Sequence, residues 1–357
     1  MNDETEKLLK YCLEGGQLSV NQCVYLFENA SLSQLAWSAH KIRTQKNKNI
    51  VYFVQNQHIE PTNVCVFQCR FCSFSVVSKE KGWSKSHAEI IQEVKQLNNS
   101  VKELHIVGGA NPDYNLDFYS LLLNEIKKLR PDIHIKAFTA AEIQYMSQLD
   151  NIGTETVLAT LKEAGLNSMP GGGAEIFNPD IRSQICPDKL NAQQWLSIHN
   201  KAHLLGIPSN ATLLYGHLET PLQRFEHMEM IRNLQKETGG FNAFIPLKFK
   251  NRNNQLSYIQ ETGIIEDLKM FALSRLFFNN IEHLKVYWPA FGKQFASIVL
   301  AFGADDLDGT IQNSTKIYSL AGSDEENPEM SCDEAKTIIQ SAGFMPVERD
   351  ALYNSIV

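Results

Sequence analysis

Residues 63–75 read NVCVFQCRFCSFS and place Cys65, Cys69 and Cys72 on one short segment, with Phe71 directly before the last of them. Three thiolates at this spacing can fold around a small inorganic cube, each ligating one iron of a 4Fe–4S cluster and leaving the fourth iron open. A structural zinc site instead needs four closed ligands, and the next cysteine, Cys186, is more than a hundred residues away. The segment therefore favours a cluster over zinc, and we expect the rest of the fold to be arranged around it.

The composition is that of a chain able to bury a large core. Of its 357 residues 43% are hydrophobic, and 33 Lys and Arg stand against 40 Asp and Glu, a formal charge of −7. This balance argues against nucleic acid or an anionic membrane as the main partner, because either would favour a basic face. The polar N-terminus is unlike a signal peptide, no apolar run could span a bilayer, and the seven cysteines are unevenly spaced. We expect a soluble cytoplasmic protein.

The chain divides into three segments. Residues 1–48 are expected to form an N-terminal helical extension, because Ser19 and Ser31 each open a capping-box pattern before an apolar helical run. Residues 49–325 are expected to form a barrel core. Residues 326–357 are expected to form a C-terminal helix and tail packed on that barrel.

A strand-then-helix rhythm repeats through the core. The candidate strands are 51–59, 104–108, 133–138, 166–169, 209–215, 243–247, 285–288 and 298–302. Amphipathic helices are expected between them, for example over 86–97, 117–129, 191–205 and 221–237. This alternation implies parallel strands with helical crossovers and predicts an α/β fold, a full or partial (β/α) TIM-type barrel. An open doubly wound sheet is the alternative.

Glycines and acidic residues follow several of the predicted strands. They are Gly108-Gly109, residues 139–142, residues 171–175, residues 216–219 and the acidic run 305–308. The cysteine segment likewise follows the first strand. Barrel enzymes carry their chemistry at the carboxyl ends of the strands, so these residues are expected to share one site.

The spacing CxxxCxΦC, in which Phe71 is the aromatic residue, resembles the signature of the radical S-adenosylmethionine (SAM) enzymes. The resemblance implies a barrel of the radical SAM type, a 4Fe–4S cluster held by Cys65, Cys69 and Cys72, and SAM chelated on the open iron. It also implies a small-molecule substrate and an electron donor such as flavodoxin or ferredoxin. The alternative from another class is a non-catalytic zinc or cluster-sensing protein, which would not need the residues at the other strand ends.

Later motifs resemble the places where this superfamily contacts SAM. The Gly108-Gly109 pair resembles the glycine motif near the methionine amino group, and glycine lets a backbone approach a ligand closely. Residues 216–219, GHLE, resemble the fifth-strand motif near the adenine. Taken alone, a glycine pair more often forms a turn, and an acidic residue at such a place more often caps a helix. The candidate SAM-binding residues are Phe71, Gly108, Gly109, Glu142, Glu175, Gly216 and Glu219.

Longer stretches, among them HIEPTN (58–63), KAFTA (136–140), MPGGGAEIF (169–177) and DDLDGT (305–310), resemble the radical SAM enzymes of the futalosine route to menaquinone, and most of all the aminofutalosine synthases. The sister cyclic dehypoxanthine futalosine synthases share several stretches, and a deazaflavin-cofactor synthase is a more distant relative. The resemblance implies that a 5′-deoxyadenosyl radical from SAM adds to the alkene of 3-[(1-carboxyvinyl)oxy]benzoate, followed by rearrangement and decarboxylation.

The substrate of that reaction carries two carboxylates, so cations are expected at the barrel mouth. Lys248 and Lys250, just past the sixth predicted strand, are the candidate substrate-binding residues, with a solvated loop as the alternative. The family's loop more often reads P-L-x-F-H-P, whereas this chain has Lys250 and Asn251 at the last two positions, and Ser319 stands where His is usual. These departures concern substrate contacts and leave the cluster ligands unchanged.

Four polar residues are candidate catalytic groups that could steer the substrate or move a proton. They are His58, Glu60, His217 and Asp306, the last in a run with Asp305 and Asp308. The structural alternatives are a buried, hydrogen-bonded histidine and a turn or cap aspartate. The remaining cysteines, Cys12, Cys23, Cys186 and Cys332, are expected to be structural.

Overall fold

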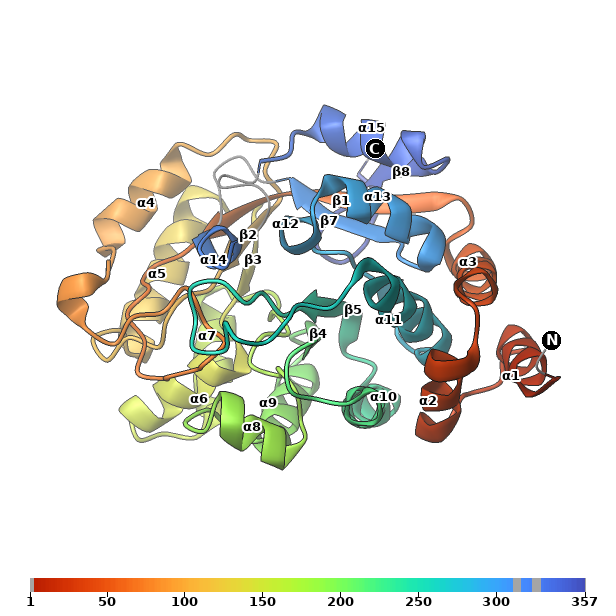
Figure 1. The fold of residues 1–357 in the computed structure, drawn as a ribbon. Helices are drawn as coiled ribbons and strands as arrows, with labels where there is room; N and C mark the ends of the chain where they lie inside the picture. The colour runs from red at the N-terminus through yellow and green to blue at the C-terminus, as the bar shows by residue number, and fades with distance from the viewer. Residues whose placement is uncertain (1–2, 311–315, 323–328, 357) are drawn as a thin grey trace.

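Parallel strand ladders occupy the middle of the molecule, and helices cover their outer side (Figure 1). The computed structural model describes residues 3–310, 316–322 and 329–356. The strands are β1 (Ile50–Ile59), β2 (Glu103–Ile106), β3 (His134–Ala137), β4 (Ser209–Tyr215), β5 (Phe241–Lys248), β6 (His283–Leu284), β7 (Asp306–Thr310) and β8 (Met345–Glu348).

The helices begin before β1 and alternate with the strands after it. They are α1 (Asp3–Leu13), α2 (Val20–Asn29), α3 (Leu32–Asn47), α4 (His87–Lys95), α5 (Leu116–Leu129), α6 (Ala140–Leu149), α7 (Thr154–Ala164), α8 (Pro179–Ile185), α9 (Ala192–Leu204), α10 (Pro221–Thr238), α11 (Ile264–Phe277), α12 (Trp288–Phe291), α13 (Lys293–Val299), α14 (Lys316–Ser319) and α15 (Cys332–Ser341), with 3₁₀ turns η1 (Lys79–Lys81) and η2 (Leu300–Phe302). Of the helices in the described ranges, none is long and apolar enough to cross a membrane.

The strands form two parallel ladders that together make a partial (β/α) TIM-type barrel. One ladder has the order β3-β2-β1-β7, with β8 also paired to β1, and the other has the order β4-β5-β6. Single parallel bridges join the ladders on both sides, through residues 168–169 between β3 and β4 and through Lys285 and Asp306 between β6 and β7. The predicted fold class is confirmed, and the loops after the strands meet at one end of the barrel.

The N-terminal extension is helical because its sequence caps each helix. Ser19 and Ser31 accept hydrogen bonds from the third residues of α2 and α3, and the glutamine side chains there accept bonds from the serine backbones in return. Leu35 and Ala39 are fully buried where α3 packs against α11. The predicted helical extension is therefore confirmed, with α3 ending at Asn47.

Two of the strand predictions are wrong. The apolar run 298–302 is helical, in α13 and η2, and Gly303 ends η2 in a left-handed conformation with a φ of 106°. The strand predicted at 285–288 lies earlier, as β6, and Pro289 sits in the first turn of α12. A short apolar run is compatible with a buried strand and with a buried helix, so hydrophobic periodicity does not separate the two.

The ends of the core also differ from the prediction. The acidic run 305–308 does not follow a strand, because most of it forms β7. Residues 166–169 contribute isolated bridges rather than a full strand. The sequence does not predict β8, whose residues are at most half-buried, yet it pairs in parallel with the start of β1 from Ile50 to Phe53. The C-terminal segment therefore extends the central ladder.

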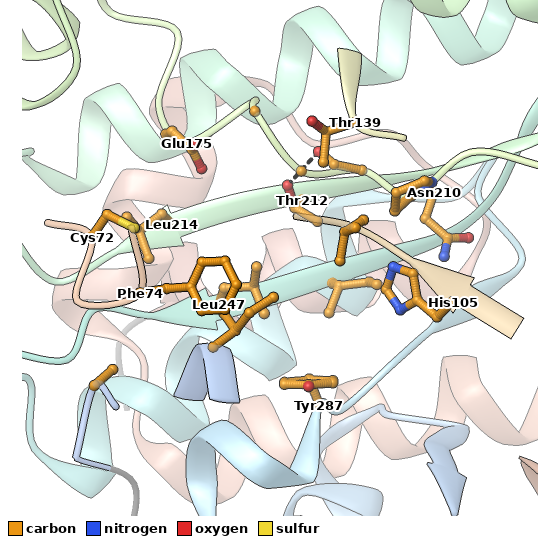
Figure 2. A pocket seen from close by; sticks show the side chains of 18 of the residues that line it. Cys72, Phe74, His105, Thr139, Glu175, Asn210, Thr212, Leu214, Leu247 and Tyr287 are labelled. Carbon is orange, nitrogen blue, oxygen red and sulfur yellow. Dashed lines mark hydrogen bonds between the residues drawn. The ribbon is translucent and has the colours of Figure 1, made fainter. Parts of the chain in front are cut away.

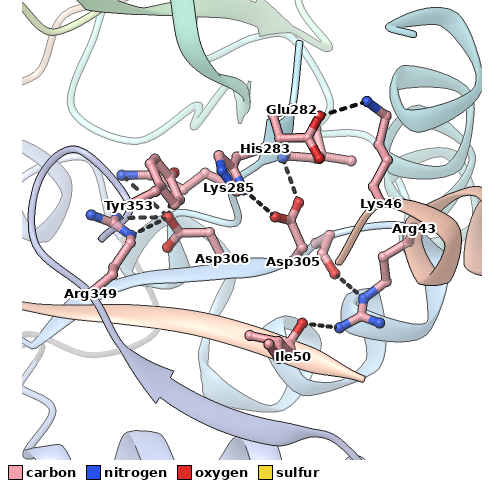
Figure 3. Close-up of polar contacts among 12 residues, drawn as sticks. Arg43, Lys46, Ile50, Glu282, His283, Lys285, Asp305, Asp306, Arg349 and Tyr353 are labelled. Carbon is pink, nitrogen blue, oxygen red and sulfur yellow. Dashed lines mark hydrogen bonds and ion pairs between the residues drawn. The ribbon is translucent and has the colours of Figure 1, made fainter. Parts of the chain in front are cut away.

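Charged side chains are buried where β7 meets the C-terminal segment (Figure 3). Asp306 is fully buried and accepts hydrogen bonds from Arg349 Nε (2.9 Å) and from the Tyr353 hydroxyl (2.5 Å). Its neighbour Asp305 pairs with Arg275. Because a buried charge is tolerated only when it is paired and hydrogen-bonded, the contacts of Asp306 with Arg349 and Tyr353 fix the C-terminal segment to the barrel.

Replacing Arg349 with Met is expected to lower the free energy of unfolding by about 3–5 kcal/mol, because Asp306 keeps a buried charge without its guanidinium partner. Urea denaturation of the wild type and the variant measures the difference. The double variant Arg349→Met/Asp306→Asn should recover part of the loss.

Lys10→Met is the matched control, because Lys10 pairs with Glu14 at the surface and exposed pairs contribute about 0–1 kcal/mol. An equal loss of stability in Lys10→Met and Arg349→Met would contradict the role given to the buried pair.

Candidate active site

The three cysteines lie on the loop that follows β1, at the carboxyl end of the barrel strands. Backbone hydrogen bonds hold this loop, because Cys65 N donates to Val76 O (2.9 Å) and Val66 N donates to Ala110 O (3.0 Å). In the described ranges, no three His, Cys, Asp or Glu side chains surround a single point as one metal ion would need. A cubic cluster does not require that arrangement, since each thiolate binds a different iron.

Backbone amides point at two of the sulfur atoms. Ala110 N donates to Cys65 Sγ (3.3 Å), and Ser75 N donates to Cys72 Sγ (3.4 Å). Such bonds to sulfur tune iron–sulfur clusters, and all three cysteines of the loop are free thiols. Burial raises the pKa of Cys69 to about 12, so binding a cluster as a thiolate would release its proton. This donor set fits a 4Fe–4S cluster with three protein ligands.

Glycine is required where the loop after β2 passes the cysteine loop. A Cβ at Gly109 would lie 2.2 Å from Val64 O, and a Cβ at Gly108 would lie 2.8 Å from Thr62 O. Gly108 N also donates to Glu142 Oε1 (3.2 Å). The glycine pair therefore lets two backbone segments approach each other directly beside the cysteines.

Glu142 lies in the first turn of α6 and closes a capping box with Thr139. Its carboxyl group accepts hydrogen bonds from Thr139 N (2.7 Å), Thr139 Oγ1 (2.8 Å) and Gly108 N (3.2 Å). Burial outweighs these bonds and raises the pKa of Glu142 to about 7. A cation bound beside it would favour the charged form.

Glu175 and Lys189 form an ion pair next to the cysteine loop. Lys189 Nζ donates to Glu175 Oε1 (2.7 Å) and lies 5.6 Å from the centroid of the Phe71 ring. Burial disfavours the ammonium, but Cys69 and Glu175 outweigh burial and hold the pKa of Lys189 well above its usual value. Lys189 brings a positive charge to the cysteine loop and is not among the site residues predicted from the sequence.

The turn over residues 216–219 satisfies its own polar groups. Gly216 has a φ of 88°, and its N–H donates to Glu219 Oε1 (2.6 Å). Glu219 also accepts from His217 N (2.9 Å) and from Arg224 Nε (2.7 Å). Neither His217 nor Glu219 is among the described residues that line the cavity beside the cysteine loop.

A cavity of about 300 Å³ lies beside the cysteine loop and extends into the barrel (Figure 2). In Figure 2, Cys72 and Leu214 lie at one end of it, and His105 and Asn210 lie at the other. Leu214, Ile245 and Leu247 from β4 and β5 form an apolar wall. The inner lining also includes polar and charged residues: His58, Glu103, His105, Lys136, Lys285 and Asp308.

Both candidate substrate-binding lysines line this cavity and already have carboxylate partners. Lys248 Nζ lies 2.9 Å from Asp267 Oδ2, and Lys250 Nζ lies 3.3 Å from Glu261 Oε2. They come from the carboxyl end of β5 and the residues just after it. A substrate carboxylate would therefore share these cations with protein carboxylates.

The candidate catalytic residues are placed differently from one another. His58 lines the cavity. Glu60 accepts a hydrogen bond from Lys316 N (3.0 Å) at the start of α14, and Asp306 belongs to the C-terminal ion network. Asp308, two residues further on, lines the cavity and accepts a hydrogen bond from Lys285 Nζ (2.8 Å).

At the polar inner end of the cavity, the sequence points to His58 but not to Glu103, His105, Lys136 or Lys285. Lys136 and Lys285 fall in predicted strands, and Glu103 and His105 come from β2. The sequence does contain a signal for these residues. A strand of a parallel sheet that helices cover is usually a continuous apolar run, so a charged residue inside such a strand is unusual. Titratable groups in such surroundings are candidates for a functional site.

Two family models match the chain. The radical SAM superfamily matches residues 59–231, and the CofH/MqnC C-terminal region matches residues 238–356. The two matches together cover the cysteine loop, the barrel from the end of β1 onward and the C-terminal segment.

Several relatives are similar along most of their length. An aminodeoxyfutalosine synthase from Thermus thermophilus is 39% identical over 353 residues, which cover 96% of this chain and 94% of the relative. A 5-amino-6-(D-ribitylamino)uracil–L-tyrosine 4-hydroxyphenyl transferase from Methanopyrus kandleri is 36% identical over 327 residues, 89% of this chain and 88% of the relative. A cyclic dehypoxanthine futalosine synthase from Streptomyces coelicolor is 32% identical over 362 residues, 99% of this chain and 89% of the relative.

Solved structures share the fold. Methylornithine synthase has a TM-score of 0.74 at 17% identity, over 95% of this chain and 97% of that chain. The FeFe-hydrogenase maturase HydG from Carboxydothermus hydrogenoformans has a TM-score of 0.74 at 18% identity, over 98% of this chain and 81% of that chain.

Replacing Cys65, Cys69 or Cys72 with Ala is expected to lower the iron bound after anaerobic reconstitution from about four atoms per chain to below about one, because the cluster has only three protein ligands and is not retained as a unit when one of them is lost. Iron analysis and the visible absorption spectrum measure the loss. Cys186→Ala is the matched control, since Cys186 is a buried free thiol like Cys69 but lies outside the loop. Full iron content in all three loop variants would contradict the assignment.

Glu142→Gln is expected to change how stability depends on pH in the SAM-free protein. The pKa of about 7 in the folded protein lies above the usual carboxyl pKa of about 4.3, so folding opposes ionisation of Glu142. The wild type should therefore lose stability relative to the variant as pH rises from about 4.5 to about 7, and the difference should then stay constant. Urea denaturation across this range measures it. A difference that does not vary with pH would show that Glu142 ionises at its usual pKa.

Proposed function

Since the chain belongs to the radical SAM superfamily, in the branch that carries the CofH/MqnC C-terminal region, we propose that it is an aminofutalosine (aminodeoxyfutalosine) synthase of menaquinone biosynthesis. The 5′-deoxyadenosyl group of SAM is joined to the alkene of 3-[(1-carboxyvinyl)oxy]benzoate. Rearrangement and loss of carbon dioxide then give aminofutalosine, so SAM is consumed as a cosubstrate. When bound, the cluster and SAM supply the radical, and the protein supplies placement.

The observation that carries the proposal is a continuous cavity that connects the cysteine loop to an interior with one apolar and one polar wall. Cys72 and Phe71 line the end beside the loop, and Leu214 and Leu247 line the apolar wall. An aromatic ring that bears carboxylates has the matching distribution of apolar and polar surface. Similarity to the aminodeoxyfutalosine synthases along nearly the whole chain supports the same choice.

In this proposal the loop after β1 and the loops beside it bind the cofactors. The three cysteines ligate the cluster, and Gly108 and Gly109, which let the loop after β2 pass directly against the cysteine loop, place their backbone next to the methionine part of SAM. Glu142 and Glu175, both buried at the strand ends, are the acidic partners of SAM. The Phe71 ring forms the wall of the SAM site next to Lys189.

The substrate's alkene must then lie close to the 5′ carbon of SAM. Holding two reactants in a near-attack geometry is a large part of what an enzyme can contribute to such a step. Lys250 and Lys248, near the cysteine end of β5, neutralise the carboxylate next to the alkene. The apolar wall keeps water from the reacting atoms.

The anaerobically reconstituted protein, given SAM and dithionite, is expected to convert 3-[(1-carboxyvinyl)oxy]benzoate into a product with the mass of aminofutalosine. Mass spectrometry with SAM labelled in its adenosyl group shows whether that group enters the product. Parallel incubations contain dehypoxanthine futalosine, or L-tyrosine with 5-amino-6-(D-ribitylamino)uracil. Cys72→Ala is the negative control. Turnover in one of the parallel incubations, and none with the carboxyvinyl ether, would overturn the proposal.

A further inference from the structure

The inner end of the cavity is built from three neighbouring strands. The register of the ladder sets His58 of β1 beside His105 of β2, and His105 beside Lys136 of β3. The centroids of the two imidazole rings lie 4.6 Å apart, and all three side chains line the cavity. Because residues paired across a sheet point to the same face, backbone pairing holds this row at one depth in the barrel.

The two histidines have ring nitrogens without partners. Within the described part of the chain, neither ring nitrogen of His58 has a hydrogen-bond partner, and the Nε2 atom of His105 also lacks one. His58 is only 9% exposed, and buried polar atoms are normally hydrogen-bonded. Burial lowers the pKa of His58 to about 4 and that of His105 well below its usual value, so both rings are neutral near pH 7. A neutral imidazole has one N–H to donate.

Two lysines and an amide add donors at the same end. Lys136 Nζ donates to Glu103 Oε1 (2.7 Å), and Lys285 Nζ donates to Asp308 Oδ1 (2.8 Å). An ammonium group has three protons, so each lysine can serve a further acceptor. Asn210 also lines this end, where Glu103 Oε2 is an acceptor that lacks a partner among the described residues. The two imidazoles, the two ammonium groups and the Asn210 amide therefore bring several hydrogen-bond donors to this end, and an anionic oxygen group can accept from them.

This donor row faces the apolar wall and lies far from the cysteines. Asn210, Thr212 and Leu214 of β4 all line the cavity, and alternate residues of a strand share one face. From Asn210 to Leu214 the strand advances by about 13 Å at the usual rise per residue. Figure 2 shows Leu214 beside Cys72, and Asn210 at the opposite end beside His105. A ligand that touches both ends must therefore be elongated.

We propose that His58 and His105, with Lys136, Lys285 and Asn210 around them, form a subsite for the carboxylate on the aromatic ring of the substrate. The inference rests on the proposed function and fixes how the substrate lies. Its alkene must be at the cysteine end, where SAM binds, so the group farthest from the alkene reaches the inner end. The ring then lies against Leu214, Ile245 and Leu247. His58 and His105 thereby determine specificity for a ring carboxylate.

Two unreactive probes test the subsite by calorimetric titration into the reconstituted, SAM-loaded protein. 3-(1-Carboxyethoxy)benzoate is the saturated analogue of the substrate, and 2-phenoxypropanoate lacks the ring carboxylate. The wild type is expected to bind the first probe about 10- to 100-fold more tightly, the range of hydrogen bonds to a charged group. In the double variant His58→Leu/His105→Leu this ratio should fall to about threefold or less, while 2-phenoxypropanoate binds as before.

Three further variants keep the result interpretable. His199 is a fully buried histidine whose Nε2 atom also lacks a partner within the described chain, but it does not line the cavity. The variant His199→Leu should therefore keep the wild-type ratio of affinities for the two probes. His58→Gln retains an N–H donor and should keep part of the ratio if the leucine variants fold poorly. Lys250→Met should weaken both probes alike, because both carry the carboxylate near the alkene position.

The outcomes separate the subsite from the function. An unchanged ratio in the double variant, with aminofutalosine still formed by the wild type, overturns the subsite and leaves the function standing. Equal affinity of the wild type for the two probes also overturns the subsite. If the wild type binds neither probe and forms no aminofutalosine, the proposed function fails and the subsite fails with it.

Discussion

The barrel buries charged side chains in its interior, and the need to pair each of them shapes the rest of the structure. Lys285 Nζ lies 3.9 Å from Asp306 Oδ2 and 2.8 Å from Asp308 Oδ1. Asp306 in turn holds Arg349 of the C-terminal segment, whereas Asp308 lines the cavity. One connected set of ion pairs therefore fixes the C-terminal segment to the barrel and also positions the polar lining of the cavity.

The ladder around β1 gives the site its two chemically different walls. β1 pairs with β2, β7 and β8, and its carboxyl end leads directly into the cysteine loop. Its polar inward residues, with those of its neighbours, form the charged side of the cavity, whereas β4 and β5 supply the apolar side. Gly109 allows the loop after β2 to pass against Val64, so the cysteines lie where the cavity begins.

The sequence predicts those features that depend on local chemistry. The cysteine spacing, the serine capping boxes of α2 and α3 and the glycine pair after β2 each act over a few residues, and the structure contains all of these elements. The prediction at 298–302 fails because a short buried apolar run carries no periodicity that separates helix from strand.

The inner end of the cavity could not be read from the chain in the same way. Glu103 and Lys136, or Asp306 and Arg349, are far apart in sequence and meet only through the ladder register and the C-terminal segment. A lone lysine within a predicted strand indicates a candidate functional site. Its ion-pair partner and the cavity that it lines, however, follow only from the three-dimensional structure. The same holds for Lys189 beside Glu175.

An anaerobic crystal structure of the reconstituted protein with SAM and 3-[(1-carboxyvinyl)oxy]benzoate, without reductant, tests the central claim most directly. We expect the cluster on Cys65, Cys69 and Cys72, SAM on the open iron, and the alkene within about 3–4 Å of the 5′ carbon, as a near-attack geometry requires. The ring should lie along β4 and β5, with its carboxylate at His58 and His105. A cluster held by other ligands, or a substrate bound outside this cavity, would contradict the account.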